Sequence, residues 1–209
     1  RALKEYKRLN QFGEIGITHV FSPAFSIDDN KDNIWAADHS NEFEINWYYD
    51  PILKGNYPEY VVNIIENNGW TPDWTATELN EIKEAAALND FIGLNYYQPK
   101  RVAKNYASTE AVVTGREQST GAPGNVSFDG AYKTVKMEDK VYTKWGWEIS
   151  PEGFIQGLRM LKKRYGDVKL YITENGLGDE DPIIEGEIVD VPRINYIKEH
   201  LRAVKTAIG

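Results

Sequence analysis

The sequence contains no cysteine and only three histidines in 209 residues. Without cysteine there can be no disulfide, no cysteine-bound zinc and no cysteine nucleophile. The histidines, His19, His39 and His200, are widely separated and form no paired metal-binding motif. No apolar run reaches the roughly 18 residues that a membrane-spanning helix requires, and no signal peptide is visible. We therefore expect no metal site and no membrane segment.

The sequence also has fewer basic than acidic residues. The 24 Lys and Arg residues are outnumbered by 32 Asp and Glu residues, which gives a net charge of −8. Nucleic acids and acidic membrane surfaces favour a basic protein face, so neither partner is expected. Hydrophobic residues make up 41% of the sequence and aromatic residues 12%. This composition excludes a disordered segment and predicts a folded chain with a core.

Hydrophobic periodicity indicates helices that alternate with short apolar strands. Helices are predicted over residues 2–12, 50–54, 58–66, 77–88, 151–165 and 192–208, and strands over 15–21, 91–97 and 168–173. Thr77 is expected to start one helix and Asp190 to cap another. Residues 22–46 and 101–145 are interpreted as long loops, the second with a small hairpin and the Gly121–Gly124 turn.

This order of elements predicts an α/β protein with a parallel sheet. The strands are apolar on both faces, as is typical of buried parallel strands. No glycine-rich phosphate loop follows a strand, so a barrel of strand–helix units is favoured over a nucleotide-binding fold. Three strands cannot close an eight-stranded barrel, and the predicted architecture is therefore a partial one.

Polar side chains follow two of the predicted strands. Glu174 comes directly after residues 168–173, and Asn95 and Tyr97 end the strand that begins at residue 91. A phenol that donates a hydrogen bond to a carboxylate favours its ionised form, which a glycosidase nucleophile requires. Spacing alone leaves a non-catalytic interpretation open. In it, Glu174 is a solvated loop residue, and Asn95 and Tyr97 are packing and turn residues.

Five segments resemble glycoside hydrolase family 1 in order and spacing. They are Trp47–Pro58, Asp90–Tyr97, Trp145–Gly153, Tyr171–Gly176 and Asp190–Leu201. The resemblance implies strands five, six and seven of a TIM barrel with their helices. It also implies that Glu174 is the nucleophile of a retaining mechanism and that Tyr97 hydrogen-bonds it.

The same resemblance suggests roles for other residues. Asn95 matches a polar cleft residue near the acid/base, and Trp145 and Trp147 are candidate walls of the sugar cleft. Simple core packing is an equally good interpretation of Trp147. Arg193 and His200 are expected to hold their helix in place rather than to contact substrate.

The chain departs from the family at the second carboxylate. The family carries its acid/base in an Asn-Glu-Pro motif on the fourth strand, and residues 41–43, Asn-Glu-Phe, do not match it. We expect residues 1–209 to be a single fragment of a TIM-barrel catalytic domain, without the first four strands and the eighth. By itself this fragment is expected to be inactive.

Within this family, the sequence most resembles the bacterial 6-phospho-β-glucosidases. Trp145–Trp147, residues 121–124 and Leu88–Phe91 carry this similarity. It implies a phospho-β-glucoside substrate, no cofactor and a cytoplasmic location. Plain β-glucosides and 6-phospho-β-galactosides remain alternative substrates.

A non-catalytic class also stays open. Without the acid/base, a half-barrel could bind sugar or a protein partner without turnover. The open edges of such a half-barrel leave backbone groups unpaired, so self-association is expected.

Overall fold

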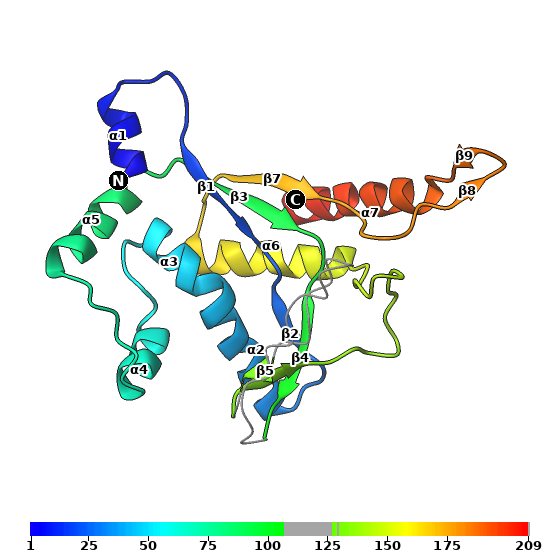
Figure 1. Cartoon of the computed structure of the whole chain (residues 1–209), viewed down its shortest axis with the longest axis horizontal. Coiled ribbons are helices and arrows are strands. Elements are labelled where there is room, and N and C mark those ends of the chain that lie inside the picture. Colours follow the sequence, from blue (N-terminus) through cyan, green and yellow to red (C-terminus); the bar gives the residue numbers. More distant parts are fainter. Residues whose placement is uncertain (107–126, 129, 209) are drawn as a thin grey trace.

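The computed structural model of the chain describes residues 1–106, 127–128 and 130–208. Its centre is a three-stranded sheet of β1 (Gly16–Val20), β3 (Phe91–Tyr96) and β7 (Leu170–Asn175), in the order β1-β3-β7 (Figure 1). Both neighbouring pairs are parallel. The predicted parallel α/β arrangement is therefore confirmed. The predicted turn at residues 121–124 lies outside the described residues.

Helices cover one face of this sheet (Figure 1). The helical elements are α1 (Ala2–Arg8), α2 (Lys31–Asn41), the π-helix η1 (Glu42–Asn46), α3 (Trp47–Leu53), α4 (Glu59–Asn67), α5 (Ala76–Ala86), α6 (Pro151–Tyr165) and α7 (Val191–Ile208). The core joins Leu94 and Tyr96 of β3 to Tyr49 of α3, Phe154 of α6 and Ala203 of α7. The burial of these apolar side chains fixes the sheet against the three helices.

The opposite face of the sheet is open within the described residues. Val20 and Tyr171 on this face are 50% and 46% exposed. Gly93 of β3 lies between Thr18 and Tyr171 in the sheet, and a Cβ there would come within 2.3 Å of the Thr18 hydroxyl. Close packing of β1 against β3 therefore requires glycine at this position. None of the helices in the described residues is long and apolar enough to cross a membrane.

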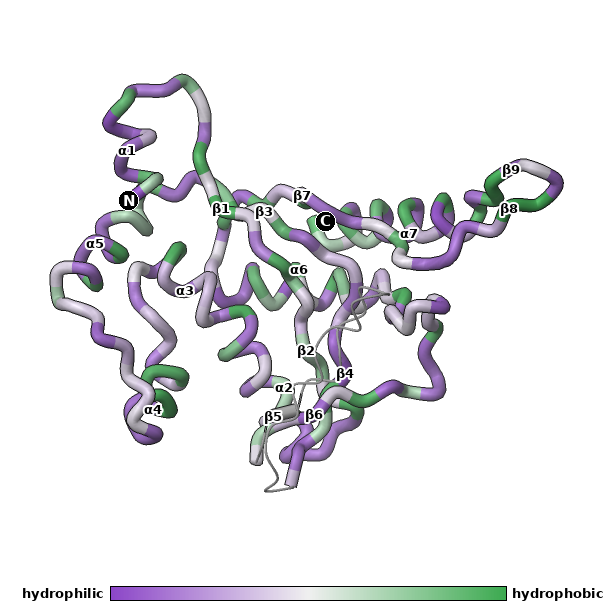
Figure 2. Tube along the Cα trace, viewed as in Figure 1, coloured by the Kyte–Doolittle hydropathy of each residue, from purple (hydrophilic) through white to green (hydrophobic). Residues whose placement is uncertain are grey.

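A second sheet continues from the ends of β1 and β3. It contains β2 (Ala24–Ser26), β4 (Lys100–Lys104), β6 (Tyr132–Thr134) and β5 (Ser127–Phe128), in the order β2-β4-β6-β5. The antiparallel β5–β6 pair confirms the small hairpin predicted in the 101–145 region. A further hairpin, β8 (Ile183–Ile184) with β9 (Glu187–Ile188), projects beyond α7 (Figure 1), and Figure 2 shows both hydrophobic and hydrophilic stretches in it.

The prediction of a loop over residues 22–46 is wrong. Residues 24–26 form β2, and α2 and η1 occupy residues 31–46. Helix α2 buries small and polar side chains, among them Ala36, Ala37 and Asn41. These residues make no hydrophobic stripe, so the usual helical signal is missing. Asn30 starts the helix by accepting a hydrogen bond from the Asp32 backbone N–H.

Several helix starts and ends also differ from prediction. Helix α1 ends at Arg8, four residues earlier than expected. Helix α3 begins at Trp47, as a continuation of the π-helix, so Pro51 lies inside it rather than at its start. Helix α5 is capped by Thr75, which forms a capping box with Glu78, and Thr77 lies within the helix.

Candidate active site

The candidate site lies where β3 and β7 end side by side. Along this pair, Leu94 is opposite Ile172, but the next pair joins Asn95 to Glu174. Thr173 is therefore an extra residue, a β-bulge one position before Glu174. Because a bulge redirects the side chains that follow it, Glu174 points to the same open side of the sheet as Asn95 and Tyr97.

Tyr97 donates its phenolic hydrogen to Oε2 of Glu174. This bond raises the pKa of Tyr97 to about 12, so the phenol stays a donor at neutral pH. Tyr97 is half-buried and Glu174 is exposed. The structure thus brings together the two residues that the sequence predicted to meet.

Asn95 lies at the same edge but does not hydrogen-bond Glu174 in the structure. Its side-chain oxygen accepts a hydrogen bond of 2.6 Å from the Thr173 hydroxyl. That bond fixes the amide beside the bulge. Asn95 is therefore placed as a polar group near Glu174, and its role as a cleft residue near the acid/base stays a prediction.

Two tryptophans stand next to this pair. The Trp147 ring lies 5.3 Å from the Tyr97 ring and 5.8 Å from the Trp145 ring. Trp145 is 37% exposed, whereas Trp147 is half-buried and its Nε1 finds no hydrogen-bond partner among the described residues. Trp147 packs against Gly178 and lies beside the Tyr97 ring, and its role as a wall of a sugar cleft stays a prediction.

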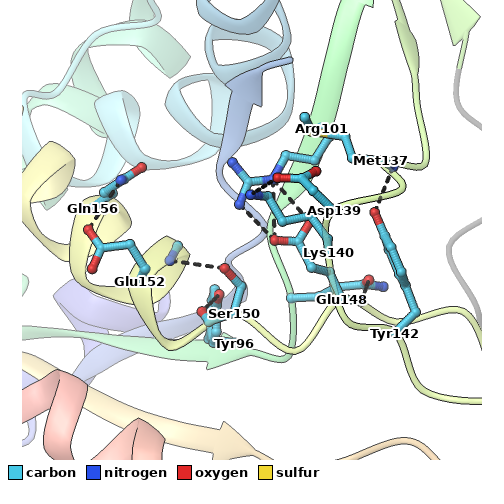
Figure 3. A network of polar contacts seen from close by, with 12 residues as sticks. Tyr96, Arg101, Met137, Asp139, Lys140, Tyr142, Glu148, Ser150, Glu152 and Gln156 are labelled. Carbon is cyan, nitrogen blue, oxygen red and sulfur yellow. Dashed lines mark hydrogen bonds and ion pairs between the residues drawn. The ribbon is translucent and has the colours of Figure 1, made fainter. Parts of the chain in front are cut away.

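A buried ion pair anchors the tryptophan segment. Arg101 donates to both carboxylate oxygens of Glu148, at 3.0 and 2.7 Å (Figure 3). The backbone N–H of Glu148 donates to the Gln98 side chain at 2.9 Å. Tyr96 donates to the carbonyl of Ser150 at 2.9 Å (Figure 3). These contacts tie residues 145–150 to the ends of β3 and β4.

The loop after β7 closes on the same segment. The Lys144 backbone N–H donates to Asp179 at 3.1 Å, and the Lys144 ammonium pairs with Glu180 at 2.6 Å. A Cβ on Gly178 would lie within 2.8 Å of both indole rings. The tryptophans and this loop therefore form one packed unit, which the spacing of the sequence did not predict.

Helix α7 is held by the two residues predicted to do so. Arg193 donates to the Leu177 carbonyl at 2.6 Å and pairs with Asp181. His200 is buried, and its Nδ1 lies 2.8 Å from the Tyr196 carbonyl oxygen. Arg193 therefore ties α7 to the loop after β7, and His200 packs against aromatic rings of β3 and α6. That neither residue contacts substrate stays a prediction.

Sequence reasoning missed Asn175 and Tyr196, which contact the backbone around Tyr97. The Asn175 amide donates to the Tyr96 carbonyl at 2.9 Å, and the Tyr196 hydroxyl donates to the Tyr97 carbonyl at 2.9 Å. Asn175 follows Glu174 directly and could have been examined for this reason. Tyr196 lies one helix away, and nothing in its sequence context indicates the contact.

Charged groups in the described part of the chain form no cluster that could hold a metal ion. The site instead offers a carboxylate, a phenol, an amide and two indole rings at one edge of a sheet. Such a set can present a nucleophile beside aromatic surfaces that suit a sugar ring.

The sequence profile of glycosyl hydrolase family 1 matches residues 1–209. The chain belongs to this family. A relative within it, the aryl-phospho-β-D-glucosidase BglC of Bacillus subtilis, is 32% identical over the whole chain, which spans 43% of BglC. A 6-phospho-β-galactosidase of Streptococcus equi is 34% identical, and the chain spans 45% of it. The chain thus spans less than half the length of these family 1 relatives.

Family 1 structures confirm the predicted fold. The β-glucosidase of Thermotoga maritima superposes with a TM-score of 0.77 at 28% identity, over 99% of this chain and 41% of the other. The fold is accordingly part of a TIM barrel, and the sheets formed by the described residues do not close into a complete barrel.

Proposed function

We propose that residues 1–209 carry the nucleophile of a retaining β-glycosidase that hydrolyses 6-phospho-β-glucosides. The observation that supports this most directly is the hydrogen bond from Tyr97 to Glu174 at the adjoining ends of β3 and β7. In TIM-barrel enzymes, reactive groups gather at the carboxyl ends of the strands. The family membership of the chain makes glycoside hydrolysis the chemistry that fits this carboxylate.

In the proposed reaction Glu174 attacks the anomeric carbon of the sugar. A bond forms between its carboxylate oxygen and that carbon, while the bond to the leaving-group oxygen breaks. A second carboxylic acid protonates the leaving group and then activates the water that hydrolyses the glycosyl ester. We assign this acid/base to the barrel segments that the relatives have and that these 209 residues do not span. The 209 residues alone are therefore expected to show no turnover.

The names of the relatives support a phosphorylated sugar. They include a phospho-β-glucosidase from Bacillus subtilis and a 6-phospho-β-galactosidase from Streptococcus equi. A second Bacillus subtilis relative, GmuD, is named a 6-phospho-β-glucosidase. A phosphorylated substrate fits an enzyme of the cytoplasm, where sugar phosphates are retained. Trp145, Trp147 and Asn95 are the residues we assign to the sugar cleft, with no cofactor required.

Trapping of the glycosyl ester tests the proposal. The complete gene product is incubated with a dinitrophenyl 2-deoxy-2-fluoro-β-glucoside 6-phosphate, whose leaving group needs little acid assistance. Intact mass should rise by one fluorosugar phosphate, and peptide mapping should place the adduct on Glu174. Glu174→Gln should abolish labelling, whereas Glu180→Gln, in the exposed loop nearby, should leave it unchanged. An adduct on another residue, or none, would contradict the assignment of the nucleophile.

The same reagent without the phosphate tests the substrate class. A phospho-glycosidase should be labelled faster by the phosphorylated sugar than by the plain glucoside. The galacto-configured phosphate gives the third comparison. Faster labelling by the plain glucoside would overturn the phosphorylated substrate and leave the nucleophile assignment standing.

A second candidate function follows from the open sheet. In the described residues β1 and β7 each pair with a strand on one side only. Such edges favour self-association, and the half-barrel could then act as a binding module. Sedimentation of the 209-residue chain should show a dimer or larger species. A monomer at all concentrations would exclude this mode of association.

A further inference from the structure

We propose that Tyr196 is a positioning residue for the Tyr97–Glu174 pair, acting through the hydroxyl that it presents from α7 to the ends of β3 and β7. The assignment rests on the proposed function only in calling this pair reactive. The contacts that carry it belong to the structure itself.

The Tyr196 hydroxyl joins the two strand ends. It donates to the backbone carbonyl of Tyr97 at 2.9 Å and accepts from the amide of Asn175 at 3.2 Å. Tyr97 is the phenol that bonds Glu174, and Asn175 is the residue after Glu174. The Tyr196 hydroxyl oxygen therefore holds both the backbone of Tyr97 and the side chain of Asn175, the residue next to Glu174.

The position of this contact matters because of the bulge at Thr173. The regular pairing of β3 with β7 shifts by one residue between Leu94 and Asn95. A bulge disrupts the ladder locally, so the strand ends beyond it are less strongly joined by backbone bonds. Asn175 and Tyr196 supply side-chain bonds at that place. The distance between Tyr97 and Glu174 is thus set partly from the helix.

Tyr196 is itself held firmly. It is 3% exposed, and its ring stacks on His200 with centroids 3.8 Å apart and planes at 24°. His200 in turn contacts the rings of Tyr96 and Phe154. Burial raises the pKa of Tyr196, so its hydroxyl remains protonated and able to donate. A rigid donor of this kind fixes the geometry of its acceptor, as support of a reactive group requires.

Titration of the Tyr97 phenol tests the proposal without need of turnover. The 209-residue chain carries isotope-labelled tyrosine, and Tyr97→Phe identifies the Tyr97 resonance among 13 tyrosines. In the unmodified chain the pKa should be about 12, because of the bond to Glu174. Tyr196→Phe should lower it by about one unit or more, as the phenol moves away from the carboxylate. Asn175→Ala should act in the same direction.

Tyr165→Phe is the matched control. Tyr165 is partly buried at the C-terminal end of α6. Its hydroxyl donates to Asp50 and Asn46, at 2.7 and 3.1 Å, and so contacts α3 and η1 rather than the ends of β3 and β7. Its loss should reduce stability without changing the Tyr97 titration. An equal shift in Tyr165→Phe, or no shift in Tyr196→Phe, would overturn the positioning role. If Tyr196→Phe does not fold, the absence of a shift in Asn175→Ala overturns it.

The proposed function is tested separately by Glu174→Gln in the same titration. If this variant leaves the Tyr97 pKa at about 12, the Tyr97–Glu174 pair itself is wrong and the proposed nucleophile loses its support. If Glu174→Gln lowers the Tyr97 pKa and Tyr196→Phe does not, only the positioning role of Tyr196 fails.

Discussion

Arg101 on β4 donates hydrogen bonds to both carboxylate oxygens of Glu148. Glu148 lies 47 positions later in the sequence, and its side chain is 3% exposed. The pair joins β4 to residues 145–150, the segment that contains Trp145 and Trp147. A charge buried in this way is costly unless its partner remains in place. The pair is therefore a sensitive point for both stability and the shape of the candidate site.

Removal of one partner should be strongly destabilising. Arg101→Met leaves the Glu148 carboxylate buried without its counter-charge, and we expect a loss of about 3 kcal/mol in the free energy of unfolding. Urea denaturation measures it. The double variant Arg101→Met with Glu148→Gln should recover part of the loss. Lys144→Met is the control, because its pair with Glu180 is 66% and 63% exposed, and should cost less than about 1 kcal/mol.

An alanine in place of Gly178 should displace the tryptophans. The added Cβ would lie 2.6 Å from the Trp147 ring and 2.8 Å from the Trp145 ring. We expect a stability loss of about 1–3 kcal/mol and a shift in tryptophan fluorescence. Gly176→Ala is the matched control in the same loop, because its Cβ would meet nothing within 4 Å. Equal effects of the two changes would refute the packing of Gly178 against the indoles.

The Tyr97–Glu174 bond should give stability a dependence on high pH. The pKa of Tyr97 is raised by this bond from 10 to about 12. Its stabilising contribution is therefore fully present below pH 10 and is lost as the pH rises through 12. The difference in unfolding free energy between the unmodified chain and Tyr97→Phe should shrink across this interval. Glu174→Gln should remove that trend, and its persistence there would assign the trend to another group.

The stability of the fold should also depend on pH in the acidic range, because of His39. Burial lowers its pKa from 6.5 to about 4, and its Nδ1 lies 2.5 Å from the Tyr60 hydroxyl. Between these values the unfolded chain binds more protons than the folded chain, so stability falls as the pH drops from 6.5 to 4. His39→Gln should flatten this part of the stability profile. Equal slopes in both proteins, measured by urea denaturation, would show that His39 does not contribute.

Much of the fold follows from local sequence signals. Helix α6 occupies the predicted residues 151–165, because Ser150 caps it, Pro151 opens it and Gly166 ends it. The parallel strands were recognisable from apolar runs between helices. The resemblance to family 1 implied the pairing of Tyr97 with Glu174, and it agrees with the rule that the carboxyl ends of neighbouring parallel strands meet at one edge.

Other features had no local signal. Helix α2 buries alanine and polar residues against a small sheet, so its tertiary contacts rather than its periodicity define it. The bulge at Thr173 depends on how β7 pairs with β3, which a single strand does not reveal. The contacts of Gly178 and Tyr196 join segments that are distant in sequence. Such contacts emerge only when the strands and helices are assembled.

The bulge has a consequence for which changes β7 can accept. Side chains alternate between the two faces of a strand, and one extra residue reverses the alternation for everything that follows. Because of Thr173, Glu174 faces the open side beside Tyr97 while Ile172 and Asn175 face the helices. If β7 kept Thr173 but paired with β3 without a bulge, regular alternation from Ile172 would turn the Glu174 carboxylate into the helical layer. Substitutions that keep the bulge alter the site, whereas a change that straightens the strand with all its residues in place would invert it.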